Sequence, residues 1–213
     1  LVGPNGAGKS TTMKILTTYL HPTAGTAKIN EFDVLENPLE ARAQIGYLPE
    51  MLPLYMDMEG RSYLTFVGKA RGLGGARLKG RIDLVVQETG LEPMFRKLVR
   101  DLSKGYKQRT ALAQALIHDP SVIILDEPTS GLDPHQIVEI RQLVKKLAKG
   151  KTVLLSTHIL QEVEASADRV VIISQGRIVG DGTVEELRKR AKKHERVRIA
   201  VQGDAAAVER DLS

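Results

Sequence analysis

Residues 3–10 read Gly3-Pro4-Asn5-Gly6-Ala7-Gly8-Lys9-Ser10, which matches the full spacing of a phosphate-binding P-loop. The loop lies between the short apolar stub Leu1-Val2 and a helix predicted over residues 9–20, the context that the motif requires. Its glycines let successive backbone N–H groups close around phosphate oxygens at a helix N-terminus. The stretch predicts nucleotide binding by Gly3, Pro4, Asn5, Gly6, Ala7, Gly8, Lys9, Ser10 and Thr11.

Three side chains of this loop have separate expected roles. The Lys9 ammonium is expected to reach the β and γ phosphates, the Ser10 hydroxyl to bind Mg²⁺, and Thr11 to lie near the α-phosphate. A glycine-rich turn without function is the plain alternative, and the motifs further along the chain argue against it. By itself the loop indicates a nucleotide and no particular reaction.

The second chemical motif is an apolar strand that ends in two carboxylates. Residues 121–125 have the pattern of a buried strand, and Asp126 and Glu127 follow directly. Because parallel α/β sheets bind ligands at the carboxyl ends of their strands, both side chains are expected beside the P-loop. Asp126 is predicted to hold Mg²⁺, usually through water, and Glu127 to accept a proton from the attacking water. A solvated strand end is the alternative.

Helical and strand patterns alternate along the chain, as they do around a mostly parallel sheet. Helical spacing at residues 59–71 and 81–89, between Gly-rich loops, predicts a helical insertion, and Thr183 with Glu186 predicts a capping box. The expected class is therefore α/β, a P-loop NTPase fold with a mostly parallel sheet and an inserted helical subdomain. The other predicted elements are strands at 26–29, 45–47, 121–125 and 152–156, a helix at 134–149, and a hairpin of 170–174 with 177–179.

Composition limits the classes of protein to consider. The 213 residues, 42% of them hydrophobic, suffice for one sizeable domain with a buried core. The absence of cysteine excludes disulfides and thiolate metal sites, and it favours a reducing compartment. A net charge of +5 is only a weak indication of a polyanionic partner, and no nucleic acid is expected. The apolar runs are far shorter than the roughly 20 residues of a membrane-spanning helix.

Residues 102–109 read LSKGYKQR and resemble the signature sequence of ATP-binding cassette (ABC) ATPases. In that family the signature lies at a helix N-terminus and contacts the γ-phosphate bound by the opposite subunit of a dimer. The resemblance implies that Ser103, Gly105 and Gln108 act in trans. Lys104 departs from the glycine that is commonest there; a cation beside the partner's phosphate is tolerable, or its side chain projects to solvent.

Two further motifs follow in the order that this family shows. Residues 130–133 read SGLD and resemble the D-loop that crosses the dimer interface, which implies an interface role for Asp133. His158, after a predicted strand, resembles the switch histidine that hydrogen-bonds the γ-phosphate and orients water. The resemblance covers nearly the whole chain and implies an ATPase that converts ATP and water to ADP and phosphate. Its implied catalytic residues are Glu127, His158 and Lys9.

Residues 45–50 read IGYLPE and stand where the family has its Q-loop, with Glu50 in place of the expected glutamine. A carboxylate oxygen still suits Mg²⁺, so the expected metal ligands are Ser10, Glu50 and Asp126. The substitution adds negative charge and removes an N–H donor, which indicates retuned nucleotide sensing. With residues 53–57 and the signature variant, this segment resembles a bacterial export-type subgroup that includes gliding-motility-associated and multidrug export ATPases.

The expected organisation is an ABC ATPase domain over residues 1–190, with a helical subdomain at about 51–104, and the start of a C-terminal extension at 191–213. The chain opens inside the P-loop strand without an initiator Met, and residues 196–201 and 204–212 have strand and helix patterns. We therefore expect truncation at both ends. The basic run 189–196 is read as a solvated helix end, with an anionic membrane surface or nucleic acid as the alternative.

The resemblance implies the ATP-binding and ATP-hydrolysing subunit of an ABC transporter, with ATP and Mg²⁺ as its cofactors. The implied partners are a second ABC ATPase subunit, as a homodimer or heterodimer, and separate membrane-spanning permease subunits at the cytoplasmic face of the cell membrane. Dimer closure on ATP would drive substrate movement, with export implied by the subgroup. The alternative is a soluble ABC ATPase that acts as a clamp on the ribosome or on DNA. Paired cassettes or long inserted coiled coils would mark such a clamp, and the 213 residues contain neither. Because truncation is expected at both ends, the two-cassette alternative stays open.

Overall fold

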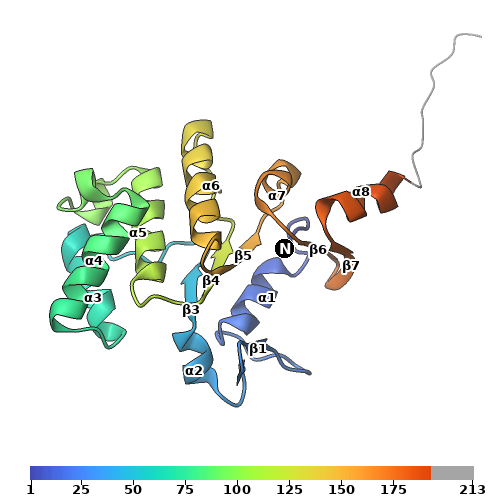
Figure 1. Ribbon diagram of the computed structural model, residues 1–213, viewed down its shortest axis with the longest axis horizontal. Helices are drawn as coiled ribbons and strands as arrows, with labels where there is room; N and C mark the ends of the chain where they lie inside the picture. Colours follow the sequence, from blue (N-terminus) through green and yellow to red (C-terminus); the bar gives the residue numbers. More distant parts are fainter. Residues whose placement is uncertain (193–213) are drawn as a thin grey trace, which may run out of the picture.

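A three-stranded parallel sheet forms the centre of the molecule, in the order β3 (Ile45–Leu48), β4 (Val122–Asp126) and β5 (Thr152–Ser156). Beyond β5, Val2 bridges in parallel to both Thr157 and Ile172. The predicted strand stub at the start of the chain is therefore a single pairing residue that connects the sheet to β6 (Val170–Ser174). This computed structural model describes residues 1–192 (Figure 1). The patterns expected at 196–201 and 204–212, and nearly all of the expected extension at 191–213, lie outside the described residues.

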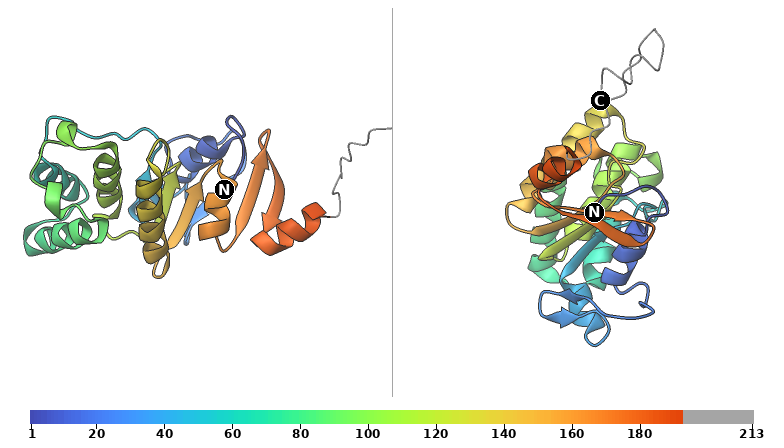
Figure 2. Two further views of the ribbon diagram at one scale, coloured as in Figure 1. Left: turned by 90° about the horizontal axis from the view of Figure 1, so that it is seen from above. Right: turned by 90° about the vertical axis from the view of Figure 1, so that its right-hand side faces the viewer.

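Helices cover both faces of the parallel sheet (Figure 2). Successive side chains of β4 point to opposite faces, so Ile123 and Leu125 pack into one cluster and Ile124 into another. The first cluster includes residues of α5 (Lys104–Leu116) and α6 (Pro134–Ala148), and the second includes Met13 of α1 (Lys9–Leu16). A strand buried on both faces reads as a continuous apolar run, which is why β4 was recognisable in the sequence.

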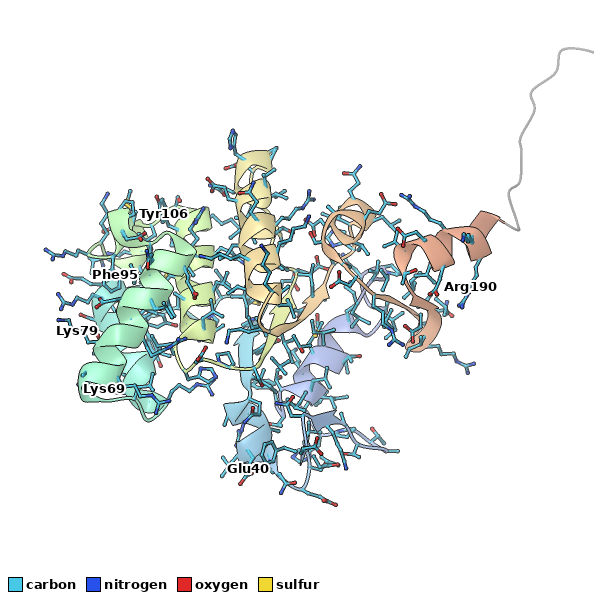
Figure 3. All side chains as sticks on the ribbon, in the orientation of Figure 1. Glu40, Lys69, Lys79, Phe95, Tyr106 and Arg190 are labelled. Atoms are coloured by element: carbon cyan, nitrogen blue, oxygen red, sulfur yellow. The ribbon has the colours of Figure 1, made fainter. Side chains whose placement is uncertain are left out.

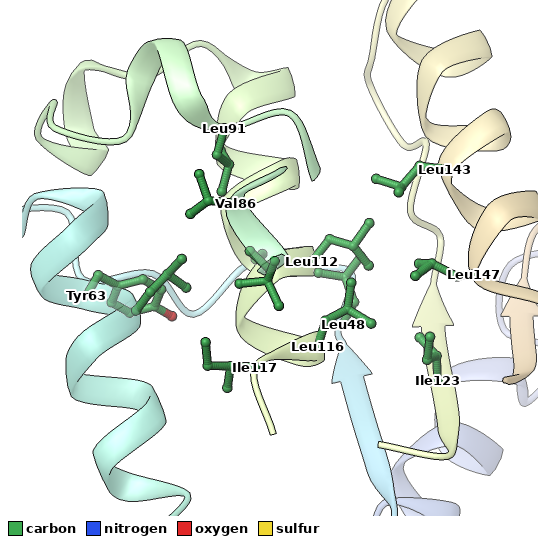
Figure 4. Packing of buried hydrophobic residues seen from close by; sticks show 14 of the residues in the cluster. Leu48, Tyr63, Val86, Leu91, Leu112, Leu116, Ile117, Ile123, Leu143 and Leu147 are labelled. Carbon is green, nitrogen blue, oxygen red and sulfur yellow. The ribbon is translucent and has the colours of Figure 1, made fainter. Parts of the chain in front are cut away.

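The helical insertion consists of α3 (Gly60–Ala70) and α4 (Gly75–Thr89), and α5 packs against both. Tyr63, Leu112 and Leu116 are each almost fully buried where these helices meet. Figure 4 shows them in one continuous cluster with Ile123 of the sheet and Leu147 of α6. Burying each leucine stabilises the folded state by about 1.5–3 kcal/mol. The proposed subdomain at about 51–104 therefore shares its apolar core with the sheet-bearing part of the molecule.

Two antiparallel hairpins and several shorter helices complete the described part of the chain. The predicted capping box is confirmed, because Thr183 N donates to Glu186 Oε2 at 3.0 Å and Glu186 N donates to Thr183 Oγ1 at 3.2 Å. Helices α2 and α7 had not been predicted, and each has seven residues or fewer. The remaining elements are β1 (Lys28–Ile29), β2 (Phe32–Asp33), α2 (Pro38–Ala43), α7 (Leu160–Ser166), β7 (Arg177–Gly182), α8 (Val184–Lys192), and the 3₁₀ turns Glu92–Met94 and Val99–Asp101.

The first helix is shorter than its sequence pattern predicts. It ends at Leu16, because Thr18 has a φ of 59°, which a helix cannot continue through. Charged side chains project from the outer surface of the helical insertion, as the labelled Lys69 and Lys79 show in Figure 3. Among residues 1–192, none of the helices combines the length and the apolar character needed to span a bilayer.

Candidate functional site

The glycine-rich loop turns directly from the sheet into α1. Gly8 has a φ of 109°, in the left-handed region that favours glycine, immediately before the helix begins at Lys9. Gly3 has no room for a side chain, since a Cβ there would lie 2.2 Å from the backbone oxygen of Ile173. The loop is therefore shaped by both backbone conformation and close packing on β6, in the strand-loop-helix context that its sequence predicted.

This loop borders an open polar cavity of about 470 Å³. The cavity brings together side chains from α1, from the loop after β3, and from the ends of β4 and β5. It combines most of the predicted nucleotide-binding residues with the predicted catalytic ones. The lining residues are Asn5, Gly6, Gly8, Lys9, Ser10, Thr11, Glu50, Glu127, Ser130 and His158.

Three predicted residues of the loop do not line this cavity: Gly3, Pro4 and Ala7. Gly3 and Pro4 instead offer their carbonyl oxygens to Lys9 Nζ, which donates to them at 2.8 and 3.3 Å. Ala7 is buried, and its N–H donates to Pro4 O at 3.2 Å. These residues hold the shape of the loop and the position of the Lys9 ammonium.

Glu127 has a constrained backbone conformation. Its φ is 49°, a left-handed conformation that costs a non-glycine residue about 1–3 kcal/mol and persists only when its surroundings hold it. Its backbone N–H is held by Ser156, through the carbonyl oxygen at 3.2 Å and Oγ at 3.1 Å. Strand β5 thus anchors the turn that carries the carboxylate.

The Glu127 carboxylate lies between two groups that can be positively charged. Its Oε1 is 3.4 Å from Lys9 Nζ, and its Oε2 is 2.9 Å from His158 Nδ1. The Glu127 side chain is 8% exposed, and Oε1 is buried without a hydrogen-bond partner in the structure. A buried carboxylate oxygen with a free lone pair beside a polar cavity is suited to accept a proton from a water molecule there.

The three expected metal ligands differ in their access to the cavity. Ser10 and Glu50 both line it, and their hydroxyl and carboxylate oxygens are the hard donors that Mg²⁺ prefers. Asp126 is 2% exposed, does not line the cavity, and accepts a hydrogen bond from the Ser156 hydroxyl. Burial, together with the Asp126 charge, raises the pKa of Tyr47 to about 12, so its hydroxyl stays neutral. The oxygen donors of Ser10 and Glu50 fit Mg²⁺, whereas the Asp126 carboxylate does not reach the cavity directly.

No cluster of three or more His, Cys, Asp or Glu side chains arranged to hold a metal occurs in the described part of the chain. Ser10 and Glu50 would each offer a bound Mg²⁺ one oxygen-bearing side chain. Mg²⁺ commonly binds in this way, through one or two protein ligands and its substrate.

The signature residues lie on α5, away from this cavity. Ser103 is exposed and caps α5, with its Oγ accepting from Tyr106 N at 3.4 Å. Gly105 is buried and packs against Gln136, whose side chain would lie 2.7 Å from a Cβ at this position. Gln108 is 6% exposed, so it faces the interior of this chain and not an open surface, which departs from the expected contact in trans.

Lys104 contacts the turn that follows Glu127, and Asp133 comes shortly after that turn in the chain. A Cβ at Gly131 would meet Lys104 Nζ at 2.0 Å, so the exposed Lys104 side chain lies against this glycine. Asp133 is exposed and caps α6, with Oδ1 accepting from Gln136 N at 2.9 Å. The residues expected at the subunit interface thus also have local structural roles.

Sequence reasoning missed Ser156, which bonds both Asp126 and the Glu127 backbone. The available indication was a serine at the end of a strand, two positions before His158. A hydroxyl there becomes informative only when β4 and β5 are known to be parallel neighbours, since the register places Asp126 opposite Ser156.

The glycine-rich loop lies beside two carboxylates and a histidine that follow the carboxyl ends of parallel strands. This arrangement defines the class of P-loop nucleoside triphosphatases. Residues 1–130 match the family described as ABC transporter, and residues 98–164 also match an AAA domain family. The chain belongs to the ABC transporter ATPase family.

Relatives of known sequence agree with this assignment. The chain is 41% identical over 189 residues to an uncharacterised ABC transporter ATP-binding protein, YxlF, of Bacillus subtilis (strain 168), covering 89% of this chain and 62% of that protein. It is 39% identical to the daunorubicin resistance ATP-binding protein DrrA3 of Streptomyces coeruleorubidus, covering 88% and 60%. It is 38% identical to the Nod factor export ATP-binding protein I of Paraburkholderia xenovorans (strain LB400), covering 88% and 62%. The chain thus spans about three fifths of the length of these relatives.

A solved structure described as the ATP-binding subunit of an ABC transporter superposes with a TM-score of 0.79. It is 34% identical in sequence, and the match covers 90% of this chain and 80% of that one. The mostly parallel sheet with helical insertion predicted from the sequence is therefore the ABC ATPase fold.

Proposed function

We propose that this chain binds and hydrolyses ATP as a subunit of an ABC transporter. The observation that carries the proposal is the position of the Glu127 carboxylate, 3.4 Å from Lys9 Nζ and 2.9 Å from His158 Nδ1, at the edge of the cavity under the glycine-rich loop. A phosphate binder with no hydrolytic role would not need a buried carboxylate held in a costly backbone conformation at this point.

In the proposed reaction, the loop binds the triphosphate and Lys9 neutralises charge on its terminal phosphates. Glu127 accepts a proton from the attacking water, and His158 orients that water and the γ-phosphate. When bound at Ser10, Glu50 and, through water, Asp126, Mg²⁺ would supply further charge neutralisation on the phosphates. In the structure, Lys9 is held by the carbonyl oxygens of Gly3 and Pro4, so its ammonium is already aimed along the loop.

We further propose a dimer in which Ser103 and Gly105 of one subunit reach the nucleotide of the other. The exposed position of Ser103 at the N-terminus of α5 supports this role, because free N–H groups at a helix start favour phosphate. The buried Gln108 would support this helix from inside and not touch the nucleotide. Asp133, at the exposed start of α6, would lie at the same interface.

The proposed partner surface for membrane-spanning subunits follows Glu50 along the chain. Four large apolar side chains are exposed there, although such residues are usually buried: Met51 at 86%, Tyr55 at 57%, Met56 at 43% and Phe66 at 47%. The rings of Tyr55 and Phe66 stack edge to face with centroids 5.6 Å apart, which fixes the shape of this patch. Because this patch is close to Glu50, binding of the membrane-spanning subunits to it would be connected to the nucleotide cavity. Such binding would place the chain at the cytoplasmic face of the membrane.

We propose export as the direction of transport, since one relative carries export in its name and another is named for drug resistance. The test is to reconstitute the full-length protein with candidate membrane-spanning subunits and to measure ATP hydrolysis and substrate efflux together. Hydrolysis that is abolished by Glu127→Gln, with efflux that depends on it, is the expected result. An active protein that stimulates no efflux, or that associates with ribosomes or DNA, would contradict the transporter assignment.

A further inference from the structure

A buried carboxylate outside the cavity connects the two segments that flank the site. Glu162, on α7, is 1% exposed. Its Oε1 accepts a hydrogen bond from Thr129 Oγ1 at 2.6 Å, and its Oε2 accepts one from Thr157 Oγ1 at 2.7 Å. Arg141 of α6 approaches Oε1 at 3.6 Å. Both carboxylate oxygens are therefore occupied and a cation lies nearby, as a buried charge requires.

The two threonines stand next to the groups that form the site. Thr129 follows Glu127 by two residues, and Thr157 directly precedes His158. Thr157 Oγ1 also accepts from the backbone N–H of Ile159 at 3.1 Å, so this hydroxyl holds the chain on both sides of His158. One carboxylate thus holds both strand-end segments whose side chains meet at 2.9 Å in the His158–Glu127 contact.

The turn after Glu127 needs such support. Glu127 has a φ of 49° and Gly131 has a φ of 66°, so the turn leaves the sheet through two left-handed residues. Within the turn, Ser130 N donates to Glu127 O at 3.1 Å, a local bond that does not tie it to the rest of the molecule. Ser156 ties the start of the turn to β5 through the Glu127 N–H, and the Thr129 side chain adds a second tie through Glu162. Left-handed non-glycine residues persist only where neighbouring structure holds them.

We propose that Glu162 is a positioning residue for the ATP hydrolysis proposed above, on which this inference rests. By fixing Thr129 and Thr157 it keeps the Glu127 carboxylate and the His158 ring at their working separation. Glu162 does not line the nucleotide cavity and touches none of the groups placed around the phosphates. Its effect is therefore on the rate of the chemical step and not on the affinity for ATP.

The test replaces each threonine in the full-length protein by valine, which removes the hydroxyl and nearly keeps the volume. Thr129→Val and Thr157→Val should each lower kcat about 10-fold or more, with the ATP dissociation constant changed less than twofold. Thr129→Ser and Thr157→Ser restore a hydroxyl and should recover most of the rate. The matched control is Glu164→Gln, which changes an exposed carboxylate on the same helix and should leave kcat unchanged.

Two further measurements distinguish a positioning role of Glu162 from a merely structural one. Thermal unfolding of each variant gives the folded fraction, to which kcat is normalised, and the NMR signals of the His158 ring report its surroundings without any turnover. The ring signals should shift in Thr157→Val and in Glu162→Gln but not in Glu164→Gln. Glu162→Gln keeps the shape of the side chain, so it serves where a valine variant fails to fold.

Folded valine variants with wild-type kcat and unchanged His158 signals would overturn the inference. In that case wild-type hydrolysis that is abolished by Glu127→Gln would leave the proposed function standing. A wild-type protein without hydrolysis would instead overturn the proposed function, so the two failures are distinguishable.

Discussion

The Nδ1 atom of His158 lies 2.9 Å from Oε2 of Glu127, although 31 positions separate the two residues in the chain. The histidine is 48% exposed and the glutamate 8%, so one partner faces the cavity while the other is held inside the protein. Lys9 Nζ lies 3.4 Å from the second carboxylate oxygen. The charge around the phosphate site therefore depends on the contacts of Glu127 with His158 and Lys9. A substitution of any one of the three changes the electrostatic surroundings of the other two.

Replacing Lys9 by alanine should weaken ATP binding by roughly 10- to 100-fold, the equivalent of one lost charge-assisted hydrogen bond. The substitution also leaves Glu127 without its neighbouring cation, which adds repulsion toward phosphate. Titration calorimetry with ATP measures the change. Lys14→Ala, an exposed lysine on the same helix, is the control and should bind like wild type. Equal affinities of the two variants would contradict phosphate binding by Lys9.

Glu127→Gln should retain ATP binding and slow hydrolysis on the order of 10²-fold or more, because the amide cannot accept the proton of the attacking water. The variant should also accumulate as an ATP-bound dimer, visible by size-exclusion chromatography. Glu40→Gln, at an exposed position on α2, should change neither property. A monomeric Glu127→Gln protein with full activity would rule out the general-base role.

Glu50 tests the departure from the family's glutamine. Its side chain lines the cavity together with Ser10, so an oxygen donor at this position can reach a bound Mg²⁺. Glu50→Gln should keep most of the ATPase activity, and Glu50→Ala should lose much of it and require more Mg²⁺. A magnesium titration of the steady-state rate measures both. Identical Mg²⁺ dependence in all three proteins would remove Glu50 from the metal site.

His118 predicts how stability depends on pH. Burial, reinforced by the nearby charge of Arg71, lowers its pKa to about 4, while Nε2 stays within 3.0 Å of the Ile45 carbonyl oxygen. In the unfolded chain the His118 imidazole therefore becomes protonated below about pH 6.5, whereas in the folded chain it becomes protonated only near pH 4. This group contributes stability that is present above pH 6.5 and is lost as the pH falls toward 4.

Chemical denaturation between pH 4 and 7 measures this contribution. Replacing His118 by glutamine should flatten the fall in the free energy of unfolding across that range, because glutamine does not titrate. His21→Gln, at an exposed histidine, should leave the pH dependence as it is in wild type. A His118→Gln protein with an unchanged slope would contradict a neutral, buried His118.

Sequence alone was sufficient where structure depends on near neighbours. The P-loop, the buried run of β4 and the Thr183–Glu186 capping box were each recognisable, since spacing within a few residues decides their conformation. Short elements such as α2 and α7 were missed, because so few residues give little periodic pattern and tertiary packing stabilises them.

Tertiary structure decided which side chains meet. Ser156 reaches Asp126 because β4 and β5 pair in parallel, and Glu162 reaches both Thr129 and Thr157 because α7 packs against the ends of these strands. Gln108, inside a motif expected at an interface, is buried by the packing of α5. The amino-acid sequence thus determined the family, the phosphate loop and the candidate catalytic residues. The burial and hydrogen bonding of those residues depended on the three-dimensional packing, since such contacts join positions that no local spacing relates.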